Sequence, residues 1–140
     1  MRVEAAALAK RLVVAAPCEL DEELVRSLHA PFAVLLAPGS APEMDLELVA
    51  ARLLAAGCRY FVCSGSNSEA VHDRIDDVIL EEGTSNVTTT FHDGESMEDV
   101  AEFFLTCAAS DMDSLLVVAE PDSSVQCAIR EALASRARPR

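Results

Sequence analysis

The sequence has no tryptophan, a single lysine at Lys10, and no apolar run long enough to cross a membrane. A transmembrane helix needs about 20 consecutive apolar residues, and the mostly apolar run over residues 30–37 is far shorter. Glu4, Lys10 and Arg11 interrupt the region where a signal peptide has a continuous apolar stretch. We therefore expect a soluble, cytoplasmic protein that does not associate with a membrane.

Short motifs that mark common cofactor and metal sites are also missing. There is no Gly-x-Gly-x-x-Gly and no Gly-x-x-x-x-Gly-Lys-Ser/Thr, which excludes the main dinucleotide and phosphate-loop signatures. The five cysteines are scattered, with no Cys-x-x-Cys pair and no partner histidines at metal-ligand spacing. We expect no cofactor, no bound metal, and free cysteines in a reducing compartment.

What is present indicates one α/β domain over residues 1–140. Apolar runs at 32–37, 59–63, 86–91 and 114–119 each precede a segment with helical periodicity, at 46–54, 71–79, 97–108 and 125–133. This alternation predicts a three-layer sandwich with a four-stranded, mainly parallel sheet, Rossmann-like or flavodoxin-like. A fifth strand is added if residues 12–16 join the sheet and do not extend an N-terminal helix. Residues 1–30 are read as a helical or mixed segment, 31–134 as βα repeats, and 135–140 as a frayed basic tail.

Three threonines, Thr88, Thr89 and Thr90, indicate where their strand lies in the sheet. Interior parallel strands are covered on both faces and tend to be continuously apolar, so we place this strand at an edge. With the four strands numbered along the chain, an edge position favours the order 3-2-1-4 over 2-1-3-4.

Helix boundaries are marked by serines followed three residues later by an acid or amide, the spacing of a capping box. The four pairs are Ser40 with Glu43, Ser66 with Glu69, Ser96 with Asp99, and Ser123 with Gln126. Gly57 and Gly83 stand where a glycine ends a helix.

The net charge of −13 is unevenly distributed: fourteen acidic residues and one basic residue lie between Asp73 and Asp122. Such a surface repels phosphate backbones, so no nucleic-acid partner is expected. The acidic region is either a solvated face or a docking face for a basic protein partner. The residues proposed for the docking face are Asp93, Glu95, Glu98, Asp99 and Glu102.

A catalytic alternative uses three predicted strand ends. Cys63 would be the nucleophile, His92 its base and Glu120 the group that orients the base, as in a small cysteine-dependent hydrolase or transferase. Phe61, two residues before Cys63, is bulkier than a tight nucleophile turn allows. His92 has a second reading, as part of a turn that starts a helix. A further alternative is a small-ligand sensor that uses the loops after the predicted strands at 32–37 and 114–119. Ser40, Ser64, Ser66 and Asn67, in strand-end loops, are further candidate binding residues.

Several short motifs resemble a family of small bacterial α/β domains of unknown function. They are Tyr60-Phe-Val-Cys-Ser-Gly65 followed by His72-Asp73, and Thr89-Thr-Phe-His92 with Glu95-Ser96. The resemblance covers roughly residues 30–135, supports the α/β fold, and implies neither an activity nor a cofactor. The family often has tryptophan at the positions of Ser64 and Phe91.

The segment at 97–109 has an apolar arc wider than one sheet face requires, because Phe103, Leu105 and Cys107 add to its core stripe. The excess either packs under the N-terminal segment or contributes to a partner or dimer contact. We expect a monomer or a homodimer. The leading hypothesis is a non-catalytic interaction or regulatory module that presents its acidic face to a basic protein.

Overall fold

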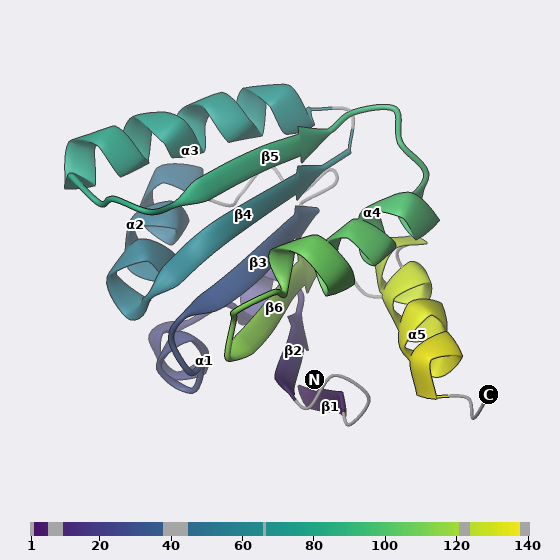
Figure 1. The fold of residues 1–140 in the computed structure, drawn as a ribbon. Coiled ribbons are helices and arrows are strands. Elements are labelled where there is room, and N and C mark those ends of the chain that lie inside the picture. The colour runs from purple at the N-terminus through teal and green to yellow at the C-terminus, as the bar shows by residue number, and fades with distance from the viewer. Residues whose placement is uncertain (1, 6–9, 38–44, 66, 121–123, 138–140) are drawn as a thin grey trace.

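The computed structural model describes residues 2–5, 10–37, 45–65, 67–120 and 124–137 (Figure 1). Within these residues six strands form one sheet in the order β1-β2-β6-β3-β4-β5. The strands are β1 (Arg2–Ala5), β2 (Lys10–Ala15), β3 (Phe32–Ala37), β4 (Cys58–Ser64), β5 (Thr88–His92) and β6 (Ser114–Ala119). β1 pairs antiparallel with β2, and all other neighbours are parallel. The α/β class and the mainly parallel sheet are confirmed.

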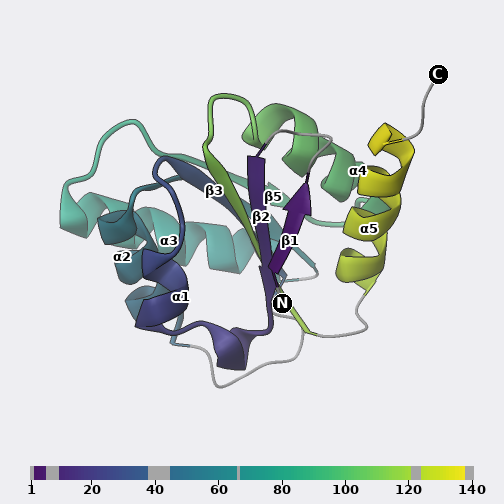
Figure 2. The same cartoon turned by 90° about the horizontal axis from the view of Figure 1, so that it is seen from below.

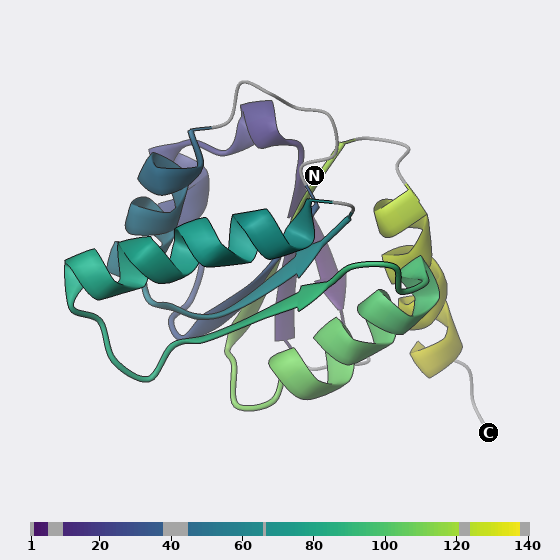
Figure 3. The same ribbon diagram turned by 90° about the horizontal axis from the view of Figure 1, so that it is seen from above.

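Helices cover both faces of the sheet in two layers, which Figures 2 and 3 show from opposite sides. The layer of α1 (Glu22–Arg26), α2 (Leu46–Ala56) and α3 (Ser68–Glu82) packs on one face. The layer of α4 (Met97–Phe103), a π-helical turn η3 (Phe104–Ala108) and α5 (Ser124–Ala137) packs on the other. A short 3₁₀ turn η2 (Pro17–Glu19) follows β2. Among the described residues, no helix has the length and apolar content needed to cross a membrane.

The central strands are apolar because helices bury both of their faces. Every residue of β3 and β6 is buried. In β5, by contrast, His92 alone is buried, and β5 is the last strand of the sheet. The predicted edge position and the order 3-2-1-4 are both confirmed, because the strands at 88–92, 58–64, 32–37 and 114–119 are neighbours in that sequence.

The N-terminal region adds more strands than the sequence indicated. Residues 12–16 fall largely within β2, which pairs with β6 and supplies the fifth parallel strand. β1 was not predicted, because Arg2–Ala5 is too short to show a periodic pattern. At the other end, α5 continues through Ala137, so the frayed tail expected from residue 135 is wrong for its first three residues.

The helix caps confirm one of the four predicted pairs and correct one other. Ser96 caps α4, its Oγ accepting from the Asp99 N–H at 3.1 Å. Asp45, and not Ser40, caps α2, accepting from the Leu48 N–H at 3.1 Å. Gln126 donates from Nε2 to the Ala119 carbonyl at 3.1 Å, so its side chain is bonded to the end of β6. Ser40, Ser66 and Ser123 lie outside the described residues.

The wide apolar arc of the segment after β5 packs within the molecule. Phe104 and Leu105 are buried in one core cluster with Ala128 and Ile129 of α5, and this cluster also contains β2 residues. Cys107, expected in the core stripe, is exposed. The helix changes pitch here, because the Ala109 N–H donates to the Phe104 carbonyl, five residues back, at 2.9 Å.

Gly57 and Gly83 end α2 and α3 in the left-handed conformation, as predicted. They differ in their surroundings, because a Cβ at Gly57 would overlap Ala30 Cβ, whereas a Cβ at Gly83 would meet nothing within 4 Å. We expect Gly57→Ala to lower the free energy of unfolding by about 3 kcal/mol, from strain plus overlap. Gly83→Ala, the matched control, should cost about 1 kcal/mol from strain alone. Urea unfolding measures both, and equal losses would contradict the predicted overlap at Gly57.

Candidate functional site

The pairing of β4 with β5 determines which strand-end side chains meet. Cys63 is opposite Phe91 and Ser64 is opposite His92. Side chains alternate between the faces of a sheet, so neighbours in the chain point to opposite sides. Cys63 belongs to the core cluster under α1, α2 and α3, and the His92 ring contacts Phe103 on the α4 side, with 4.6 Å between ring centroids. The sheet therefore separates Cys63 from His92.

The proposed set of Cys63, His92 and Glu120 is not assembled. Burial raises the pKa of the fully buried Cys63 thiol to about 12, with the negative charge of Asp76 acting in the same direction. A thiol in such surroundings is protonated at neutral pH and is a poor nucleophile. Glu120 is exposed after β6, and strands β3 and β4 lie between β6 and β5. The cysteine-dependent catalytic reading is wrong, because its nucleophile, base and orienting group lie on different faces and strands.

His92 is bonded within its own strand-to-helix turn. Its Nδ1 is 2.8 Å from Glu95 Oε2, and its Nε2 is 3.0 Å from Thr90 Oγ1. A carboxylate only accepts, so Nδ1–H donates to Glu95, and in the neutral ring Nε2 accepts from the Thr90 hydroxyl. The residue is 7% exposed. Both ring nitrogens are occupied, so the His92 ring fixes the turn and presents no open nitrogen to a substrate.

Asp93 follows His92 in the sequence, but the carboxylate bonded to His92 in the structure is that of Glu95. Asp93 is exposed, and the turn next to it carries Gly94 with φ of 77°. A positive φ of this kind favours glycine. The interpretation of His92 as part of a turn that starts a helix thus agrees with the structure.

The other predicted strand-end residues do not form a described ligand site. Ser64 and Asn67 follow β4: Ser64 is buried with no hydrogen-bond partner for its Oγ, and Asn67 is exposed without a side-chain cap bond. Ser40 and Ser66 lie outside the described residues. The loops over 38–44 and 121–123, on which the sensor interpretation depends, also lie outside them.

His72 on α3 lies beside two carboxylates, with its Nδ1 3.0 Å from Asp73 Oδ1 and its Nε2 3.5 Å from Asp76 Oδ2. Its ring also contacts Phe91 of β5, with 5.0 Å between centroids. In the described part of the chain, no group of three or more histidine, cysteine or acidic side chains is placed to hold a metal ion. The arrangement joins α3 to the sheet edge.

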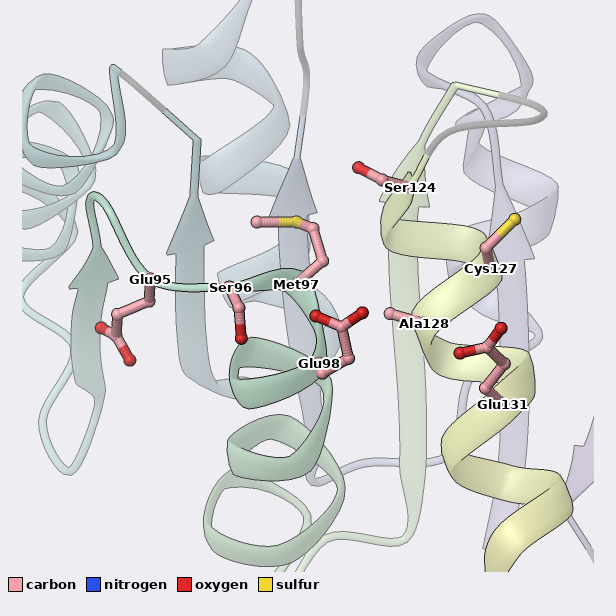
Figure 4. A pocket seen from close by; sticks show the side chains of 8 residues that line it. All are labelled: Glu95, Ser96, Met97, Glu98, Ser124, Cys127, Ala128 and Glu131. Atoms are coloured by element: carbon pink, nitrogen blue, oxygen red, sulfur yellow. The ribbon is translucent and has the colours of Figure 1, made fainter.

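A groove of about 610 Å³ lies between the first turns of α4 and α5, and we call it the α4–α5 groove (Figure 4). Its lining residues are Glu95, Ser96, Met97, Glu98, Ser124, Cys127, Ala128 and Glu131. Three of them are carboxylates and none is basic. Met97, Cys127 and Ala128 provide apolar atoms between the acids. In Figure 4, Glu98 on α4 and Glu131 on α5 stand across the groove from one another, and Glu95 lies toward the end of β5.

Sequence reasoning found the α4 side of this groove and missed the α5 side. Glu95 and Glu98 belong to the acidic region already proposed for docking, whereas Glu131 lies beyond that region and next to Arg130. The spacing of the groove residues on α5 could have shown from the sequence that they share one face of a helix. Ser124, Cys127, Ala128 and Glu131 follow one another at spacings of three, one and three, which places them on one helix face.

Comparison with known protein families gives one match, to the family described as Domain of unknown function (DUF7684), over residues 12–136. The chain belongs to this family. Its core βα repeats, both helical layers and every residue of the α4–α5 groove fall within the matched region. No curated protein and no solved structure matches the chain. The family assignment supports the predicted resemblance to α/β domains of unknown function and carries no activity with it.

The burial of Cys63 leads to a direct chemical prediction. At pH 7 we expect iodoacetamide to label Cys18, Cys107 and Cys127, which are exposed, and to leave Cys63 and Cys58 unmodified until the protein is unfolded. Burial raises the pKa of the Cys58 thiol to about 12 as well, which makes it an internal control. Mass spectrometry of peptides from native and unfolded protein measures the labelling. Native labelling of Cys63 at the rate of Cys107 would contradict the assigned burial.

Glu95 is expected to stabilise the fold through its bond to His92. Glu95→Gln removes the charged acceptor, and we expect a loss of about 1 kcal/mol in the free energy of unfolding, because the carboxylate is partly exposed. Glu98→Gln is the matched control, since it makes the same charge change one turn away on a residue without a hydrogen bond in the described structure. A change of only a few tenths of a kcal/mol is expected there. Equal effects of the two substitutions would show that the bond contributes nothing.

Proposed function

We propose that the protein is a non-catalytic interaction module that binds a basic protein partner through the α4–α5 groove. The observation that supports this proposal is the composition of the groove. Glu95, Glu98 and Glu131 line the groove from three segments, and no basic residue is in the lining. Carboxylates gathered around apolar atoms suit a lysine or arginine side chain, which has an apolar stem and a charged head.

An incoming arginine would meet both parts of this surface. Its stem would pack on Met97 and Ala128, and its guanidinium would lie between the carboxylates of Glu98 and Glu131. Hydrogen bonds between a guanidinium and a carboxylate are charge-assisted and roughly twice as strong as neutral ones. The N-termini of α4 and α5 each contribute about half a positive charge, which partly offsets this attraction. The three carboxylates of the groove carry more negative charge than the two helix N-termini carry positive charge, so attraction of a cation remains.

The surrounding surface has the same sign of charge. Asp93, Asp99 and Glu102 are exposed as well, and with Glu95 and Glu98 they make up the acidic face that we propose for docking. Steering by such a field increases association rates for a basic partner and repels phosphate backbones. We keep the cytoplasm as the expected compartment, a proposal that the free cysteines of the described chain support.

Charge reversal tests the proposal. We expect Glu98→Lys with Glu131→Lys to abolish retention of basic proteins from a lysate, and salt at about 1 M to release them from the wild type, because the screening length is then about 3 Å. The matched control is Glu22→Lys with Glu23→Lys on α1, in the opposite helical layer, which changes the net charge equally. Quantitative mass spectrometry compares the retained proteins. The proposal is wrong if both double variants retain the same set as the wild type.

A further inference from the structure

The outer edge of β5 is open within the described part of the structure. β5 pairs with β4 on one side, and no described strand pairs with its other side. Soluble proteins usually protect such an edge with proline, lysine, an inward charge or a bulge. β5 reads Thr-Thr-Thr-Phe-His, and its register with β4 has no shift. None of these four devices is present in β5, and no described strand pairs with its outer backbone groups.

Side chains of α3 border one side of this edge. Phe91 is 42% exposed, and its ring contacts His72, which in turn lies beside Asp73 and Asp76. Leu80, 79% exposed, follows Asp76 by four residues and so lies on the same flank of α3. This side of the edge combines exposed apolar groups with carboxylates.

Side chains of the α4 region border the other side, and Figure 3 shows β5 between α3 and α4. His92 points to this side, where it contacts Phe103 and holds Glu95. Asp99 precedes Phe103 by four residues and shares its flank of α4. Acidic residues therefore border the open edge on both faces of the sheet.

We propose that a basic segment of the partner binds in extended form as an additional strand on the outer edge of β5. This inference rests on the proposed function and adds the mode of binding. Backbone hydrogen bonds to β5 would supply affinity, and alternate side chains would reach Asp73 and Asp76 on one face and Glu95 and Asp99 on the other. A second copy of this chain does not suit the edge, because each copy carries a net charge of −13.

A short turn joins the end of β5 to the lining of the α4–α5 groove. Only Asp93 and Gly94 separate His92, at the end of β5, from Glu95 in the groove lining. A segment that extends along β5 and past His92 would bring its next basic side chain toward Glu95, the groove residue that lies toward the end of β5 in Figure 4.

Backbone methylation of a model ligand tests strand addition apart from charge. The ligand is a short, end-blocked peptide of alternating lysine and threonine, prepared unmethylated, with N-methyl groups on its lysines, or with N-methyl groups on its threonines. Added strands donate to the edge from alternate residues, so we expect one methylated peptide to bind at least about tenfold more weakly and the other to bind like the parent. Fluorescence anisotropy with the full chain measures all three affinities.

The groove variant Glu98→Lys with Glu131→Lys separates the two proposals. It should weaken all three peptides while preserving the difference between the two methylated forms. Equal affinities for the two methylated peptides would overturn strand addition and leave the acidic docking proposal standing. No measurable binding of the unmethylated peptide, even at low salt, would overturn both.

Discussion

Among the strands that the structure describes, β5 has a hydrogen-bonded neighbour on one side only, and this constraint affects where polar groups gather. β3, β4 and β6 have strands on both sides and helices on both faces, so their sequences are almost wholly apolar. β5 is free of that requirement and carries threonines, an exposed Phe91 and a bonded histidine. His92 then holds Glu95, which places a carboxylate at the entrance of the α4–α5 groove. The edge position of β5 in the sheet thus accounts for the position of Glu95 in the α4–α5 groove.

Much of the fold could be predicted, because each element has a local signal. The four predicted strands and their helices follow from hydrophobic periodicity, and the three threonines indicated the edge and hence the strand order. The two errors in predicting the elements, at β1 and at the cap of α2, also have local causes. β1 is too short for periodicity to detect, and Ser40 competed with Asp45, which is five residues closer to the helix that it caps. Capping residues are common in loops, so spacing alone does not select the one that bonds.

The site was harder to predict, because it depends on register and on contacts between distant segments. A shift of one residue between β4 and β5 would put Cys63 and His92 on the same face, and no feature of either strand sequence fixes that register. The groove needs α5 to lie beside α4, although their groove residues are about 30 positions apart. Glu131 lies outside the acidic region and next to Arg130 in the sequence, and only the helix geometry, which directs adjacent side chains about 100° apart, separates the two.

Hydrogen–deuterium exchange, with and without the lysine–threonine peptide, tests most directly the claim that a basic partner binds at β5 and the groove. Amides that face solvent at a sheet edge exchange quickly, and pairing with a new strand slows them. The account predicts slower exchange at Thr88–His92 and at the start of α4, with no change at the other edge strand, Arg2–Ala5. Protection elsewhere, with the exchange of β5 and α4 unchanged at saturating peptide, would contradict it.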